Sequence, residues 1–160
     1  MEPLPTQDQL TAFLCKAKIS TYASLDNQAP VKLFLPGSHQ LEYRQGSFFY
    51  RDIYFGGDFF VGFETVYYQS QPLWGMSYAG GIDEDIDLEQ TPEIYDFLKA
   101  ALRTVPSDAP YRGPGTFSRG DLRYYNRYLG NPNRFTGVET ISREGTHIFK
   151  LHYSGGLIKN

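Results

Sequence analysis

The sequence predicts an α+β fold made of two copies of one unit, in which a helix is followed by three antiparallel strands. Residues 60–66 read Phe-Val-Gly-Phe-Glu-Thr-Val, and residues 135–141 read Phe-Thr-Gly-Val-Glu-Thr-Ile. A second block, at 78–82, recurs at 153–157 with the same offset. Repeated blocks at a fixed spacing are typical of an internal duplication. We therefore expect one domain spanning 1–160, with a pseudo-two-fold relating units of about 6–82 and 91–158.

Each unit is expected to begin with a helix that covers one face of the sheet. Thr6 and Gln9 match a capping box, and the apolar residues after them predict a helix over about 7–18. The second helix should begin at Thr91-Pro92, because proline is favoured at the first helical position. Its apolar stripe consists of Ile94, Phe97, Leu98, Ala101 and Leu102.

Three strand-like segments follow each helix and are separated by turn signals rich in Gly, Pro and Asn. In the first unit they cover about 41–55, 59–70 and 72–80, and in the second about 116–129, 134–143 and 146–154. The connections within each unit are short, which predicts antiparallel meanders.

The repeated strands place a carboxylate on the face expected to point inward. Side chains alternate along a strand, and the more apolar face carries Glu64 in the first unit and Glu139 in the second. A buried carboxylate is costly unless it accepts hydrogen bonds, pairs with a cation or meets a ligand. Two interpretations remain. In the first, the glutamates have a structural role and hold the two halves together. In the second, they lie in an aromatic cavity that binds a polar or cationic aromatic molecule.

The aromatic content supports a polar-lined cavity or an interface. The chain has 13 Tyr and 12 Phe, and buried tyrosine hydroxyls need polar partners. Gly62 and Gly137 remove volume beside each glutamate, leaving room for a helix backbone or a ligand. We favour the first unit as the ligand-binding copy. The candidate ligand-binding residues are the two glutamates, inward aromatics and an arginine from a stiff loop: Glu64, Glu139, Tyr50, Tyr54, Trp74, Tyr78, Tyr124, Tyr128, Tyr153 and Arg112.

The composition of the chain disfavours several classes of binding partner and several cellular compartments. The formal net charge is −3, which disfavours direct binding to nucleic acid or to an anionic membrane. There is no apolar run of membrane length and no secretory signal, and the single cysteine cannot form an internal disulfide. We therefore expect a cytoplasmic protein. The histidines lack metal-binding spacing, and no nucleotide-binding or catalytic motif is present, so no metal, cofactor or catalytic residue is assigned.

Four short motifs carry a family resemblance: Trp74-x-Met76-x-Tyr78-x-Gly80, Phe60-x-Gly62-x-Glu64, Phe97-Leu98-Lys99 and Arg112-Gly113-Pro114. Over about 10–158 the chain resembles an uncharacterised bacterial family known as a domain of unknown function, whose members often follow a helix-turn-helix of XRE-type regulators. Only a few residues precede the first helix here, so we expect no attached DNA-binding module. The tandem architecture is also similar to gyrase-inhibitor-like effector-binding domains, although no motif is shared.

Three function classes follow from these patterns. The leading one is small-molecule (effector) binding or sensing, based on the inward glutamates and tyrosines. The second is a protein-interaction or structural module, with a homodimer as one form of it. The third is an unrecognised enzyme that uses a buried glutamate as acid or base. A single cavity holding one glutamate of raised pKa near an arginine would favour the enzyme.

Overall fold

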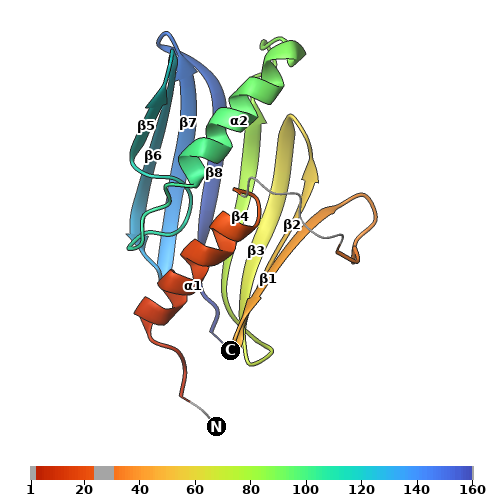
Figure 1. The fold of residues 1–160 in the computed structure, drawn as a ribbon, viewed down its shortest axis with the longest axis vertical. Coiled ribbons are helices and arrows are strands. Elements are labelled where there is room, and N and C mark those ends of the chain that lie inside the picture. The colour runs from red at the N-terminus through yellow and green to blue at the C-terminus, as the bar shows by residue number, and fades with distance from the viewer. Residues whose placement is uncertain (1–2, 24–30, 160) are drawn as a thin grey trace.

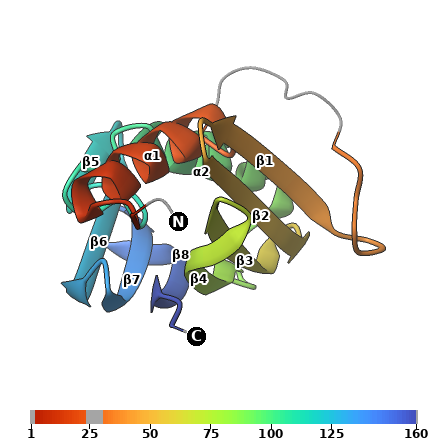
Figure 2. The same cartoon turned by 90° about the horizontal axis from the view of Figure 1, so that it is seen from below.

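The fold is an eight-stranded antiparallel sheet with two helices on one of its faces. The computed structural model describes residues 3–23 and 31–159. Figure 1 shows both helices in front of the sheet, and Figure 2 shows the sheet curled around them. The predicted α+β class with antiparallel strands is therefore confirmed. Among the described residues, no helix is long and apolar enough to cross a membrane.

The strands form one continuous sheet in the order β1-β2-β3-β4-β8-β7-β6-β5. All neighbours are antiparallel, and β4 pairs with β8 at the centre, with Tyr78 opposite Tyr153. The bounds are β1 His39–Gln45, β2 Phe48–Gly56, β3 Phe59–Tyr68, β4 Gln71–Ile82, β5 Thr116–Arg119, β6 Leu122–Asn131, β7 Arg134–Arg143 and β8 Thr146–Leu157.

The expectation of three strands after each helix is wrong, because within the described residues four strands follow each one. The segment predicted over 41–55 is two strands, β1 and β2, and the segment over 116–129 is β5 and β6. The chain reverses at Gly46 and Gly120, whose φ angles are 56° and 60°. Glycine adopts this left-handed conformation without steric cost, so each of these tight turns ends one strand and begins the next.

Both helices begin where the sequence indicates. Helix α1 spans Gln7–Ser20, and its capping box is complete: the Gln9 amide donates to the Thr6 hydroxyl and the Thr6 amide donates to the Gln9 side chain. Helix α2 spans Thr91–Leu102 with proline in its first turn, after a short 3₁₀ helix, η1, at Leu88–Gln90. Its predicted apolar stripe is buried against the sheet.

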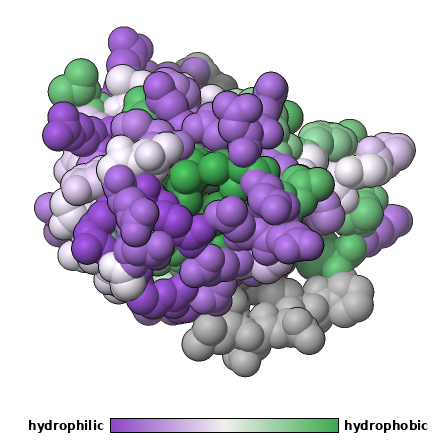
Figure 3. Space-filling view, turned by 90° about the horizontal axis from the view of Figure 1, so that it is seen from above, coloured by the Kyte–Doolittle hydropathy of each residue, from purple (hydrophilic) through white to green (hydrophobic). Residues whose placement is uncertain are grey.

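The core lies between the helices and the concave face of the sheet, and aromatic rings fill much of it. Trp74 stacks on Phe135, with ring centroids 5.6 Å apart, and Tyr111 stacks on the same Phe135 ring at 3.9 Å. The surface of the molecule carries both hydrophobic and hydrophilic residues. The face in Figure 3 shows a hydrophobic hollow ringed by hydrophilic residues. The outward face of β3 exposes Phe59, Val61 and Phe63.

Candidate ligand-binding site

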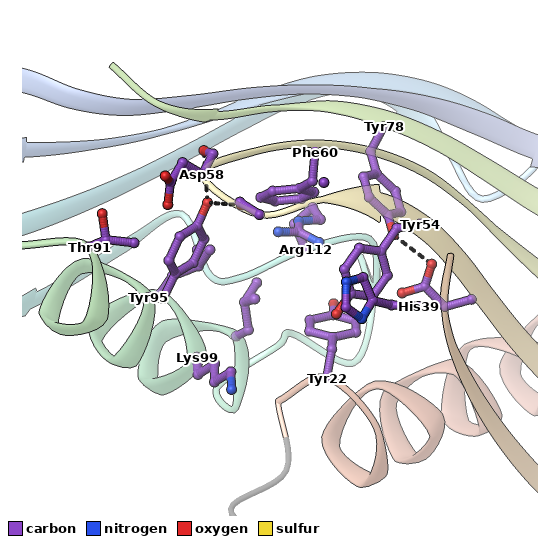
Figure 4. Close-up of a pocket in the computed structure, with 15 residues that line it drawn as sticks. Tyr22, His39, Tyr54, Asp58, Phe60, Tyr78, Thr91, Tyr95, Lys99 and Arg112 are labelled. Atoms are coloured by element: carbon purple, nitrogen blue, oxygen red, sulfur yellow. Dashed lines mark hydrogen bonds between the residues drawn. The ribbon is translucent and has the colours of Figure 1, made fainter. Parts of the chain in front are cut away.

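A pocket of about 400 Å³ opens between α2, the end of α1 and the first half of the sheet. Six rings line it: Tyr22, His39, Tyr54, Phe60, Tyr78 and Tyr95. In the view of Figure 4, Tyr95 lies on one side of the cavity and Tyr54 and Tyr22 lie on the other, with Arg112 between them. Tyr54 stacks on His39, with centroids 4.8 Å apart. The walls therefore offer flat apolar surfaces, as ligand pockets usually do.

Asp52 is a buried carboxylate that lines this pocket. It is 2% exposed, and its Oδ1 accepts a hydrogen bond of 2.6 Å from the Tyr78 hydroxyl. Burial raises the pKa of Asp52 to about 7, the Glu64 carboxylate directly opposite on β3 adds to that rise, and the Tyr78 hydrogen bond opposes it. The site thus contains a carboxyl group that changes charge near neutral pH.

Glu64 is fully buried next to Asp52 and is paired with Lys18 of α1. The Lys18 Nζ lies 2.6 Å from Glu64 Oε2 and also donates to the Tyr111 carbonyl oxygen at 2.6 Å. Burial lowers the pKa of Lys18, and the neighbouring Glu64 carboxylate counteracts that shift. Within the described residues, Glu64 Oε1 and the Tyr50 hydroxyl are buried without a hydrogen-bond partner.

Glu139 is fully buried in the second half of the sheet and has a complete set of partners. Arg112 donates to its Oε1 from Nε at 3.0 Å and from Nη2 at 2.5 Å. The Tyr124 hydroxyl donates to Oε2 at 2.7 Å and accepts from the Gly113 amide. The side chain of Asn126 also links the sheet to the loop that contains Gly113. Its oxygen accepts a hydrogen bond from the Tyr153 hydroxyl, and its NH₂ group donates to the Gly113 carbonyl oxygen. This network ties the loop before β5 to the sheet.

The candidate residues are divided between the pocket and the core. Tyr54, Tyr78 and Arg112 line the pocket. The two glutamates lie in the core behind it, together with Tyr50, Trp74, Tyr124 and Tyr153. Tyr128 is 41% exposed and meets Tyr111 edge to face. The pocket therefore contains three of the ten candidates, and its carboxylates are Asp52 and Asp58 rather than either glutamate.

Among the residues of this site that sequence reasoning missed are Lys18, Tyr22, His39, Asp52 and Tyr95. Signals existed for two of them. Lys18 follows Leu14 by four positions and so lies on the apolar stripe of α1. Asp52 shares strand parity with Tyr50 and Tyr54. No local pattern marks Tyr22, His39 or Tyr95, because they meet only through the tertiary fold.

The space beside each repeated glycine is filled by a tyrosine ring from the neighbouring strand. Gly62 lies opposite Tyr78 and Gly137 lies opposite Tyr153. A Cβ at Gly62 would lie 2.3 Å from the Tyr78 hydroxyl oxygen, and one at Gly137 would lie 2.2 Å from Tyr153 Cζ. The two glycines thus let each tyrosine lie across the sheet and reach Asp52 or Asn126.

We expect Gly137→Ala to destabilise the fold by about 1–3 kcal/mol, because a methyl group there overlaps a ring that packing holds in place. Urea denaturation followed by circular dichroism measures this change. Gly115→Ala is the matched control, since a Cβ at Gly115 meets no atom within 4 Å and its φ is not left-handed. Equal stabilities for the two variants would contradict the packing role of Gly137.

A family model matches residues 52–158 of this chain, and it describes a domain of unknown function, DUF5680. The chain belongs to this family. The matched region of this DUF5680 chain contains Asp52, Tyr54, Tyr78 and Arg112, whereas Lys18, Tyr22 and His39 lie outside it. No curated protein and no solved structure shows a significant match to the chain.

Proposed function

We propose that this DUF5680 protein binds a small aromatic molecule in the pocket between α2 and the first half of the sheet. The observation that carries the proposal is one cavity with six aromatic or imidazole rings in its walls and two buried charged residues, Asp52 and Arg112, at its surface. Flat rings favour a planar ligand, and the polar groups fix its orientation. A volume of about 400 Å³ is in the range of small-molecule sites.

The proposal includes an internal duplication with unequal fates for the two halves. Asp52 of β2 and Asn126 of β6 each accept a hydrogen bond from a tyrosine two strands away, Tyr78 of β4 and Tyr153 of β8. Each buried glutamate pairs with one cation. Asn126 is neutral and fully engaged, whereas Asp52 is ionisable and reaches a pocket. We infer that the first half kept the ligand contact and that the second became structural.

The biological role that we propose is effector sensing in the cytoplasm of a bacterium. Ligand binding would stabilise the contacts that join α1 and α2 to the sheet, because both the end of α1 and the face of α2 contribute to the pocket. Such a domain would act with a regulator, as the resemblance to regulator-linked families implies.

A thermal-shift screen of planar aromatic metabolites tests the binding proposal. A ligand at 100 times its dissociation constant should raise the free energy of unfolding by about 2.7 kcal/mol. Tyr54→Ala should weaken binding by at least roughly tenfold, because it removes one wall and its contact with His39. Tyr125→Ala makes the same change at a 44% exposed position on the outer face and should leave binding unaltered.

Two results would contradict the proposal. One is a screen in which no planar compound stabilises the protein. The other is a ligand whose affinity changes equally in the Tyr54 and Tyr125 variants, since that ligand would bind elsewhere.

General acid–base catalysis is the second candidate, and one observation favours it. Asp52 has a pKa of about 7 and shares the cavity with Arg112, which suits a group that exchanges a proton at neutral pH. Chemical conversion of a bound compound, detected by mass spectrometry and lost in Asp52→Asn, would support this function. A bound compound recovered unchanged would favour sensing.

A further inference from the structure

Asp52 differs from the other two buried carboxylates near the pocket in its lack of a counter-ion. Within the described part of the chain, Lys18 pairs with Glu64 and Arg112 pairs with Glu139, and no ion pair includes Asp52. Its Oδ1 accepts a hydrogen bond from the Tyr78 hydroxyl, which is a neutral donor. Asp52 also lines the pocket, so a ligand can reach it.

The surroundings of Asp52 leave one negative charge unbalanced. Glu64 faces it from β3, Tyr78 from β4, Lys18 and Tyr22 from α1 and its end, and Arg112 from the loop before β5. The exposed side chains of His39 on β1 and Lys99 on α2 also line the pocket. Three carboxylates and two cations meet in this interior. A cationic or N–H-rich ligand group supplies what the site lacks, whereas an anionic group would add to the excess.

The rings restrict which N–H-bearing group reaches the carboxylate. Phe60 and Tyr78 meet edge to face on one wall, and Tyr54 lies beside them. A planar group enters between such rings more easily than a tetrahedral ammonium, and its faces remain in apolar contact. A carboxylate binds two parallel N–H donors best when they lie in one plane.

Resting on the proposed function, we propose that the pocket takes a flat aromatic molecule with an amidine-type edge, in which two adjacent N–H groups donate to Asp52. The ligand class comprises aryl amidines and amino-substituted nitrogen heterocycles. Oδ1 can accept from the ligand while it accepts from Tyr78, because a carboxylate oxygen has two lone pairs. Arg112 and Tyr22 line the same pocket.

Binding of an amidinium also requires Asp52 to be ionised, so it is coupled to one proton. When Asp52 is protonated, the carboxyl group releases its proton to the solvent as the amidinium binds. The ligand keeps all its protons, and the complex holds a neutral ion pair. Since the pKa of Asp52 lies at about 7, the apparent affinity should fall roughly tenfold per pH unit below that value and level off above it.

Isothermal titration calorimetry with benzamidine, a cation throughout the range from about pH 5 to pH 8, tests this assignment. Benzamide is the matched neutral probe, because it has the same ring and shape but lacks the second N–H-bearing nitrogen. Titrations in buffers of different ionisation enthalpy measure the protons released. We expect benzamidine to bind at least roughly tenfold more tightly than benzamide at pH 8, with nearly one proton released at pH 5 and almost none at pH 8.

Asp52→Asn should lower benzamidine affinity at least roughly tenfold and abolish the proton release, while the Tyr78 hydroxyl keeps an acceptor. Asp85→Asn is the control: it makes the same change at an exposed position that does not line the pocket, and it should preserve both quantities. The pH dependence of the unmodified protein tests the proposal even if the Asp52 variant folds poorly.

The outcomes separate this inference from the proposed function. If benzamide and benzamidine bind equally, with an affinity that depends on Tyr54, the aromatic pocket stands and the assignment of Asp52 is wrong. If benzamidine binds with no proton release at pH 5, or equally well to Asp52→Asn, the assignment is also wrong. If neither probe binds in a Tyr54-dependent manner, the assignment of Asp52 is wrong, and the thermal-shift screen decides the proposed function separately.

Discussion

Replacing Lys18 by methionine should destabilise the protein by about 3–5 kcal/mol, the largest effect that we expect from a single side chain. The substitution preserves the length of the apolar stem but removes the cation that pairs with Glu64 at 2.6 Å. Glu64 would then lie fully buried and directly opposite Asp52, so two carboxylates would face each other without compensation. The Tyr111 carbonyl oxygen would also lose its donor.

Urea denaturation measures this loss, and two further variants interpret it. Arg119→Met removes a cation from the Arg119–Asp96 pair, which lies on the surface, and should cost less than about 1 kcal/mol. The double variant Lys18→Met, Glu64→Gln removes both charges and should recover much of the stability. If Lys18→Met costs no more than Arg119→Met, the buried pair does not join α1 to the sheet.

The second large effect concerns pH. The pKa of Asp52 is raised from its ordinary value to about 7 in the folded protein, so the folded state binds this proton more tightly than the unfolded state does. Between about pH 4 and pH 7 the folded state therefore holds more protons, and the free energy of unfolding must fall as the pH rises. The contribution of Asp52 to stability is fully present only below its ordinary pKa of 3.8 and is lost by about pH 8.

Asp52→Asn should remove this pH dependence, because an asparagine carries no charge at any of these pH values and still accepts from Tyr78. We expect the variant to be more stable than the unmodified protein at pH 8 by a few kcal/mol, and the difference to shrink towards pH 5. Denaturation at several pH values measures both curves. An Asp58→Asn control should follow the unmodified protein, since Asp58 is exposed. Parallel curves for Asp52→Asn and the unmodified protein would contradict the raised pKa.

Both experiments depend on the same arrangement of charges. Lys18 offsets Glu64, Arg112 offsets Glu139, and Asp52 is left to adjust its protonation or to meet a ligand. Stability and ligand recognition are therefore linked in the pocket. A ligand that holds Asp52 ionised should oppose the loss of stability that the unmodified protein shows at high pH.

The sequence by itself determined the antiparallel α+β class, the starts of both helices and the inward faces of the repeated strands. These features follow from local rules: caps, proline at a helix start, and alternation of side chains. Alternation is why Glu64 and Glu139, two positions far apart in the chain, were both expected to point inward, and both are fully buried. The same rules failed at Gly46 and Gly120, where single left-handed residues divide what reads as continuous strands.

The tertiary structure alone decided which carboxylate meets the pocket. Parity places Asp52, Glu64 and Glu139 on one face of the sheet, but it does not show where a cation from another element will lie. Lys18 arrives from 46 residues before Glu64, and Arg112 from 27 residues before Glu139. Each of these ion pairs neutralises one buried glutamate. The packing of α2 against the sheet leaves a cavity next to Asp52. Because ion pairing in a low-dielectric interior depends on distances between segments remote in sequence, only the folded chain could separate the structural carboxylates from the one exposed to a ligand.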